Sequence, residues 1–319
     1  ALPARVVSYL IGAVFGRFQS ISYNSIEIGV LDQGHSQDLE KLVVQASEQI
    51  GISDDLLRGT IEQMCGDTGG LRKWIASSFF DWHIKRYSRS RRKAPVYWQL
   101  ATPSAAYSIW LYYHRLTKDT FFQVLNEFVK PKLSHEQRKL DRLRGEAGAE
   151  PTRTQRKVLE DQEKLIVELS SFREEIQRIA PLWNPNINDG VIINFAVLWR
   201  LVPQNKSWQK ECKKVWDKLV KGEYDWAHLA MHLWPERVVP QCVTDASLAI
   251  AHGLEDVFWE QDDRDRFRPK EEPAGGWEPV VGKLIDERTS PAVKVALENL
   301  LKAPAPAGNT KSRPRKARK

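Results

Sequence analysis

Residues 94–113 read APVYWQLATPSAAYSIWLYY, and the expected fold divides around this stretch. β-branched and aromatic residues between Pro95 and Pro103 predict a short strand. The spacing that follows predicts an aromatic-rich helix from Ser104 to Val129. Its core candidates are Tyr107, Leu111, Tyr112, Phe121, Phe122, Leu125 and Phe128.

Short helices and loops are expected before this stretch. Ser53 is a suitable N-cap for a helix from Asp54 to Met64. A second helix begins after Gly70, because apolar residues recur at helical spacing up to Trp82.

A basic segment follows that second helix. Eight lysines and arginines lie between positions 72 and 93, against the single acid Asp81. Such residues can neutralise phosphates, and nearby aromatic rings can stack on bases. A charge run can equally be a solvated face. The residues we expect to contact DNA are Lys85, Arg86, Arg89, Arg91, Arg92, Lys93, Tyr97 and Trp98.

Residues 134–180 are dense in charged residues and glutamine and predict an antiparallel helical hairpin. Ser134 and Thr152 each begin a capping box, and residues 145–151 form the turn. The second helix carries a coiled-coil seam at Val158, Gln162, Leu165, Leu169, Phe172, Ile176 and Ile179. Because the turn supplies a partner helix, we favour a strut or docking arm over a dimerisation coiled coil.

The C-terminal half is expected to be helical. VIINFAVL, at residues 191–198, predicts a short strand or a buried segment after the turn at Asn188-Asp189-Gly190. Helices return over residues 208–234, and an acidic, solvated linker follows. Ser290 and Pro291 begin a last helix that buries Val293, Ala296, Leu297, Leu300 and Leu301.

The predicted fold is therefore α+β and mainly helical. It combines a recognition domain with a small sheet, a long antiparallel helical hairpin and a C-terminal helical domain. The expected divisions are a recognition-like domain (1–132), the hairpin arm (133–180), the C-terminal domain (181–260), an acidic linker (261–289), a terminal helix (290–303) and a disordered basic tail (304–319).

Charge is distributed unevenly along the 319 residues. The formal net charge is +7, and residues 302–319 alone contain seven lysines and arginines and no acid. The first 301 residues are therefore formally neutral, so the tail indicates only non-specific affinity for polyanions.

Several features of the sequence bear on the cellular compartment of the protein. The three cysteines are far apart and suggest neither a disulfide framework nor a metal clip, which favours the cytoplasm. No stretch resembles a membrane span or a secretory signal. The chain begins with apolar sequence and without methionine, and we expect it to be part of a longer protein.

Enzyme signatures are absent from the sequence. Neither a phosphate-binding glycine loop nor G-x-S-x-G occurs. His228 and His232, with Cys242 and His252 nearby, could supply zinc ligands, but H-E-x-x-H is missing and a structural histidine pair is the favoured interpretation. Asn184-Pro185-Asn186-Ile187 lacks the second proline and the aromatic residue of the N-P-P-aromatic motif of amino-methylating enzymes, and we reject it as catalytic.

Several long strings are together similar to one family. They are FGRF (15–18), RYSRSRRKAPVYWQLATP (86–103), LYYHRLTKDTFFQVLNEFVKPKL (111–133), LWNPNINDGVIINFAVLWRLVP (182–203), WDKLVKGEYDWAHLAMHLWPERVVPQC (216–242) and SLAIAHGLEDVFW (247–259). They resemble the C-terminal part of PglX-type adenine-specific DNA methyltransferases of BREX phage-exclusion systems, which have relatives among restriction enzymes that combine modification and cleavage. The likeness extends from about Val6 to Leu301 and is weakest in residues 33–68, the acidic linker and the tail.

The resemblance implies a target-recognition region without its catalytic half. In that family the S-adenosylmethionine fold and its N-P-P-Y loop precede the matched region. We therefore expect no cofactor in this chain and no transferase activity from it alone, with S-adenosylmethionine bound elsewhere in the parent enzyme. The implied partners are double-stranded DNA and other proteins of the defence system.

Two functions follow as hypotheses. The first is DNA binding that determines the specificity of an adenine-N6 methyltransferase. The second is a non-enzymatic scaffold, in which the hairpin and the tryptophan-rich helices dock other defence proteins or a phage inhibitor.

Overall fold

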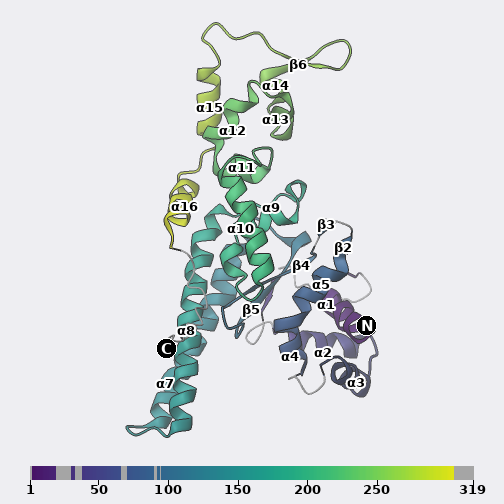
Figure 1. Cartoon of the computed structure of the whole chain (residues 1–319), viewed down its shortest axis with the longest axis vertical. Helices are drawn as coiled ribbons and strands as arrows, with labels where there is room; N and C mark the ends of the chain where they lie inside the picture. Colours follow the sequence, from purple (N-terminus) through teal and green to yellow (C-terminus); the bar gives the residue numbers. More distant parts are fainter. Residues whose placement is uncertain are drawn as a thin grey trace, which may run out of the picture.

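The computed structural model describes residues 2–18, 30–32, 38–65, 70–89, 92–93 and 95–304. The described chain is mainly helical with small antiparallel sheets, as the sequence predicts. It is elongated, with the N-terminal helices beside a central sheet, a helical hairpin projecting at one end and residues 246–288 at the other (Figure 1).

The described N-terminal part contains five α-helices, of which α2 and α3 pack on α1. They are α1 (Leu2–Val14), α2 (Leu39–Gln49), α3 (Asp54–Cys65), α4 (Gly70–Trp74) and α5 (Phe80–Tyr87), with a π-helical turn, η1 (Ile75–Phe79), joining α4 to α5. The Leu56 N–H donates to Ser53 Oγ over 3.4 Å, which confirms the expected cap of α3.

The central sheet corrects the expected helix from Ser104 to Val129. β4 (Tyr97–Ala101) is the predicted strand, but β5 (Ser108–Tyr112) pairs antiparallel with it, and β1 (Val30–Asp32) pairs with the other edge of β5. All five residues of β5 are buried. A strand buried on both faces is apolar throughout, so its sequence lacks the alternation that distinguishes a strand from a helix.

Adjacent residues of β4 face different halves of the molecule. The Tyr97 ring stacks on Phe15 of α1, with centroids 5.0 Å apart. The next ring, Trp98, stacks on Phe195 at 4.4 Å. Side chains alternate across a strand, so the sheet is the shared wall between the N-terminal and C-terminal helices.

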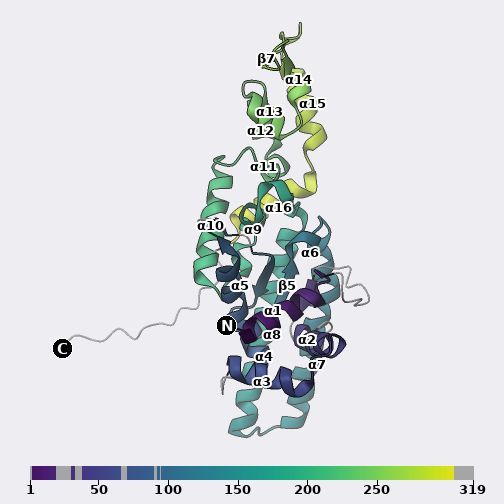
Figure 2. The same ribbon diagram turned by 90° about the vertical axis from the view of Figure 1, so that its right-hand side faces the viewer.

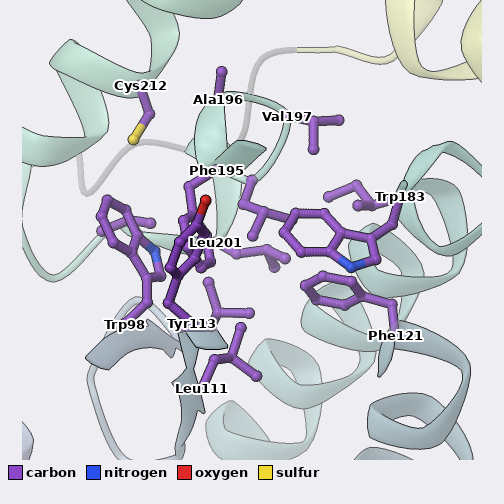
Figure 3. Close-up of a cluster of buried hydrophobic side chains, with 14 of the residues drawn as sticks. Trp98, Leu111, Tyr113, Phe121, Trp183, Phe195, Ala196, Val197, Leu201 and Cys212 are labelled. Atoms are coloured by element: carbon purple, nitrogen blue, oxygen red, sulfur yellow. The ribbon is translucent and has the colours of Figure 1, made fainter. Parts of the chain in front are cut away.

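Figure 3 shows the C-terminal side of this wall. Trp98 and Tyr113 lie against Phe195, and Phe121 meets Trp183 edge-on at 4.8 Å. This cluster is continuous with the hydrophobic core on the N-terminal side.

The remainder of residues 104–129 contains only short helical pieces. After β5 come η2 (Tyr113–Arg115), α6 (Thr120–Gln123) and a π-helical turn, η3 (Val124–Val129). Phe122 is 43% exposed, contrary to its expected place in the core, whereas Phe121 and Phe128 are buried.

The helical hairpin is formed by α7 (Lys130–Ala147) and α8 (Arg153–Ile179). The capping box at Thr152 is confirmed, but the one at Ser134 is wrong, because η3 continues directly into α7 and Ser134 lies inside the helix. The expected division at residue 132 likewise falls inside α7.

The seam of α8 packs on α7 of the same chain. Gln162 Nε2 donates to the Glu136 carboxylate over 2.7 Å, and Lys132 pairs with that carboxylate at 2.6 Å. Burial alone would raise the pKa of Glu136, but these contacts outweigh it and lower the pKa. Val158 is 45% exposed and lies outside the packed part of the seam.

The C-terminal half consists of the longer helix α10 and a series of short helices, of which α9 and η6 pack on α10. They are η4 (Ala180–Leu182), η5 (Ile187–Asp189), α9 (Val191–Ala196), η6 (Trp199–Leu201), α10 (Lys206–Val220), α11 (His228–Leu233), α12 (Pro235–Cys242), α13 (Ala246–Ala251) and α14 (Glu255–Phe258). VIINFAVL is thus buried, as expected, but begins as helix rather than strand.

The acidic segment is structured over part of its length. β6 (Trp259–Gln261) pairs with β7 (Phe267–Pro269), and α15 (Glu278–Arg288) packs against α12. α16 (Pro291–Lys302) is the predicted terminal helix, although Leu301 is 48% exposed rather than buried. Within the described ranges, no helix has the length and apolar character needed to cross a membrane.

His83 ties α5 to the first residues of β4. Its Nε2 accepts the backbone N–H groups of Val96 and Tyr97, at 3.1 and 3.2 Å. Burial, assisted by the nearby Arg17 charge, lowers the pKa of His83 to about 3. The imidazole is therefore neutral at physiological pH, and only the neutral ring can accept these two hydrogen bonds.

We expect His83 to make folding stability dependent on pH. Its pKa is depressed in the folded state, so stability is present above about 6.5 and falls toward pH 3 by up to ~1.4 kcal/mol per pH unit. In His83→Gln the side-chain oxygen can accept the same N–H groups and does not titrate there. Urea unfolding at pH 8 and pH 5 should give a smaller pH difference for H83Q than for the wild type; equal differences would contradict this role.

Candidate nucleic-acid interface

The structure brings the expected basic residues to one end of α5. Lys85 and Arg86 are exposed in the last turn of that helix. Arg89 in β2 (Ser88–Arg89) pairs with Arg92 in β3 (Arg92–Lys93), which places the backbone of Lys93 in the same short hairpin. Arg91 lies outside the described residues.

The two aromatic residues expected at the interface are in the core instead. Tyr97 and Trp98 have no exposed surface. They belong to the strand that both halves of the molecule cover, so neither ring can stack on a base while β4 is folded. The expectation that they contact DNA is corrected: they position other elements.

A second basic surface, which sequence reasoning missed, lies on α10. Six lysines at residues 206–221 face away from the buried side of the helix: Lys206, Lys210, Lys213, Lys214, Lys218 and Lys221. We call this the lysine face. Five of these residues, Lys210 to Lys221, line a surface hollow of about 470 Å³ with Asp217 and Glu223.

Only two of the six lysines on the lysine face are paired with carboxylates of described residues. Lys213 pairs with Asp217 at 2.7 Å, and Lys218 pairs with Glu223 at 2.5 Å. Lys210, Lys214 and Lys221 are exposed and form no ion pair with any residue that the structure describes. Their charges are therefore available to an external anion.

The sequence indicates the lysine face only through the apolar residues on the opposite, buried side of α10. Trp208, Cys212, Val215, Trp216 and Leu219 recur at helical spacing and are buried. Because buried residues are interspersed among the lysines, the segment contains no continuous run of basic residues that would reveal the surface. The lysines become one surface only after the helical period is applied.

Both basic surfaces are anchored to β4 and its neighbours. The Asn205 amide donates to the Asp81 carboxylate, which joins the start of α10 to the start of α5. Trp208 of α10 meets Trp98 edge-on, with centroids 5.6 Å apart. In Figure 2, α10 runs along one edge of the molecule on the side where α5 also lies.

Arg237 holds the other end of α10. Its guanidinium donates to the carbonyl oxygens of Leu219 and Val220, at 2.9 and 3.0 Å, and pairs with Asp225 at 2.6 Å. These are the carbonyls that a helix leaves without intrahelical partners at its C-terminus. The last turn of the lysine face is thereby fixed.

An exposed aromatic ring lies next to this end of α10. Trp226 is 46% exposed and meets Tyr224 edge-on at 6.1 Å. Lys218 Nζ lies 5.4 Å from the centre of the Tyr224 ring. This arrangement offers the stacking surface that was expected of Tyr97 and Trp98.

The histidines singled out in the sequence meet at a separate cavity of about 280 Å³. Its lining residues are Asn184, Pro185, Asn186, His228, Met231, His232, His252 and Arg288. The described residues contain no group of three or more His, Cys, Asp or Glu placed to hold a metal ion. Cys242 is buried elsewhere in α12, and its thiol donates to the Val238 carbonyl.

The segment from Asn184 to Ile187 has a structural role beside this cavity. The Asn186 side chain accepts the Asn188 N–H over 2.9 Å and begins η5. The Asn194 amide donates to the Asn186 carbonyl over 2.6 Å.

No protein-family model matches this chain, and a search of curated proteins finds no significant match. The function therefore has to be inferred from the residues and their arrangement.

Two tryptophans test the division between core and surface. Trp98→Ala should lower the free energy of unfolding by about 3–5 kcal/mol, because it removes a fully buried ring. Trp226→Ala, the matched exposed change, should cost about 0.5 kcal/mol or less. Urea unfolding of both variants measures this, and similar costs would show that Trp98 is not part of the core.

Proposed function

We propose that this chain binds double-stranded DNA, with the lysine face of α10 and the basic end of α5 contacting phosphates. The observation that carries the proposal is the lysine face, which presents three exposed lysines without ion-pair partners among the described residues. Phosphate contacts of this kind give affinity and position, whereas base contacts give sequence preference.

The distribution of charge supports a local interface. Residues 1–301 are formally neutral, so a strip of free lysines is a local excess rather than part of a general positive charge. Six lysines accompany three acidic residues over residues 206–223. A molecule with one basic side favours a ligand that touches it on that side only.

The finer proposal comes from the resemblance to PglX-type methyltransferases. We assign to this chain the DNA-recognition role of an adenine-N6 methyltransferase in phage defence. Methyl transfer is not assigned to it, because its sequence has neither a glycine-rich nucleotide loop nor an N-P-P-aromatic motif.

The double variant Lys210→Gln with Lys214→Gln tests the proposal. Log Kd for a duplex should vary linearly with log salt concentration, with a slope near 0.9 for each phosphate contacted. Removing two lysine contacts should therefore reduce that slope by about 2 and weaken binding at low salt. Fluorescence anisotropy with a labelled duplex over a salt series provides the measurement.

The matched control is Lys157→Gln with Lys164→Gln. These lysines are also exposed on a helix, but on α8 of the hairpin arm. Their removal should leave the slope unchanged. Absence of duplex binding at low salt, or equal losses in both double variants, would overturn the proposal.

A second candidate function, docking of another protein, is favoured by the hairpin arm. It projects from the body (Figure 1), and Val158 and Val167 of α8 are 45% and 65% exposed. Deleting the whole arm would be uninformative, because Leu169, Phe172 and Ile176 of α8 belong to the core.

Val158→Glu with Val167→Glu is the sharper test of docking. If the arm docks proteins of the same defence system, the double variant should fail to co-purify with them and should bind DNA as the wild type does. Unchanged co-purification would exclude docking through this surface.

A further inference from the structure

Trp226 is an exposed ring whose chain neighbours are buried. Its side chain is 46% exposed, whereas Asp225 and Ala227 on either side of it lie in the interior. Among the tryptophans that the structure describes, it alone is exposed. Single exposed apolar side chains are ordinary in proteins, so exposure by itself does not identify a site. The surroundings of the ring have to supply the argument.

The backbone that carries Trp226 is held on several sides through Asp225. The Asp225 carboxylate pairs with Arg237 at 2.6 Å and accepts a hydrogen bond from Gln241 Nε2 over 2.9 Å. His252 Nε2 donates to the Asp225 carbonyl oxygen over 2.7 Å, because a carbonyl only accepts. The ring is therefore carried on a fixed turn, and a ligand that covers it has little backbone to order.

The turn between α10 and Trp226 requires a glycine. Gly222 has φ of +86°, a backbone conformation that other residues rarely adopt. A Cβ atom at this position would also lie only 3.2 Å from Asp225 Oδ2. This tight turn keeps Trp226 close to the end of the lysine face.

Tyr224 connects the exposed ring to the lysine face. Trp226 meets the Tyr224 ring edge-on, with centroids 6.1 Å apart, and Lys218 Nζ lies 5.4 Å from the centre of that ring. Lys218, Lys221 and Glu223 all line the hollow on α10. Because Lys218 contacts Tyr224 and Tyr224 contacts Trp226, the ring and the hollow are neighbouring parts of one surface.

Trp199, another ring beside the lysine face, differs from Trp226 in being covered. Arg200 lies 4.9 Å and Lys213 lies 5.3 Å from the centre of the Trp199 ring. Trp199 is also less exposed than Trp226. Cations of the chain itself already occupy the Trp199 ring, so Trp226 is the ring with surface to offer a ligand.

The accessibility of base faces decides which form of DNA this ring can meet. In a duplex, the two faces of each base are covered by the neighbouring base pairs, and only the edges reach the grooves. An indole ring can stack only on a base whose face is open, which is an unpaired base. Exposed aromatic rings beside a positively charged groove are the combination with which proteins bind single-stranded nucleic acid.

We propose that Trp226 stacks on an unpaired base of DNA whose phosphates lie on the lysine face. The ligand class is duplex DNA that continues into a single-stranded segment. This inference rests on the proposed function, because the lysine face supplies the phosphate contacts beside the ring. Stacking on an aromatic ring tolerates every base, so the site reads the absence of pairing and not the sequence.

Three DNAs tested with the full chain separate bases from phosphates. They are a blunt duplex, the same duplex with one strand extended at both ends by thymidines, and the same extended duplex with abasic nucleotides in place of the thymidines. The two extended DNAs carry equal numbers of phosphates. Fluorescence anisotropy at one salt concentration should show about fivefold or tighter binding of the thymidine form than of the abasic form. Equal binding of these two would overturn the inference.

Variants assign the preference to the ring. Trp226→Ala should reduce the ratio of the two affinities to about one, and Trp226→Tyr, which keeps an aromatic ring, should retain most of it. Phe122→Ala is the matched control, because Phe122 is 43% exposed on α6 and is not part of the lysine face. An unchanged ratio in W226A, or an equal loss in F122A, would show that Trp226 does not stack on the base.

The double variant Lys210→Gln with Lys214→Gln separates this inference from the proposed function. It should weaken binding of all three DNAs and leave the ratio of thymidine to abasic affinities unchanged, because phosphate contact and stacking are different interactions. Binding of the blunt duplex without a preference for thymidines overturns the inference and leaves duplex binding intact. Failure to bind any of the three DNAs at low salt overturns both.

A direct readout of the ring is available by fluorine NMR. In the chain labelled with 5-fluorotryptophan, the Trp226 resonance is identified by its loss in W226Y. It should shift on addition of the thymidine-extended duplex and stay in place with the abasic form. An equal shift with both DNAs, or no shift with either, would contradict stacking; the second result is also the one expected if the ring docks a protein instead.

Discussion

Burial of β4 and β5 on both faces is the constraint from which the rest of the structure follows. Tyr97 packs toward α1, while Trp98 packs toward α9 and α10. The sheet therefore joins the two halves of the chain into one core. The short hairpin of β2 and β3 lies in the chain between α5 and β4, which His83 ties together. The lysine face is attached to the same strand, because Trp208 of α10 packs on Trp98. Both candidate phosphate contacts thus depend on the same strand.

Local signals in the sequence predicted the elements whose causes are local. Ser53 and Thr152 cap helices as expected, and the turn before Thr152 folds α8 back on α7. Residues 104–129 were predicted wrongly because β5 is buried on both faces and so has no alternation to reveal it. VIINFAVL has strand-forming residues, but its burial among other helices decided its conformation.

The residues of the candidate site likewise separate into those that local sequence predicts and those that only the folded structure brings together. Charge density correctly marked the segment at the end of α5 as basic and exposed at Lys85 and Arg86. Proximity in sequence then suggested Tyr97 and Trp98 as stacking rings, but pairing with β5 buries them. The lysine face required the helical period of α10, and the cavity required His228 and His252 to meet Arg288 from helices far apart in sequence. The meeting of these three residues at one cavity depends on tertiary packing, which residue spacing in the sequence does not reveal.

The two positive features differ in how they would hold an anion. The lysines of α10 are exposed to water and salt, so their attraction is weak for each charge and falls steeply as salt displaces it. Arg288 lines a partly enclosed space, where screening by salt is weaker. Salt should therefore weaken the attraction for an anion more at the first surface than at the second. No lining residue of the cavity belongs to the lysine face, so the two features are separate surfaces of the C-terminal half.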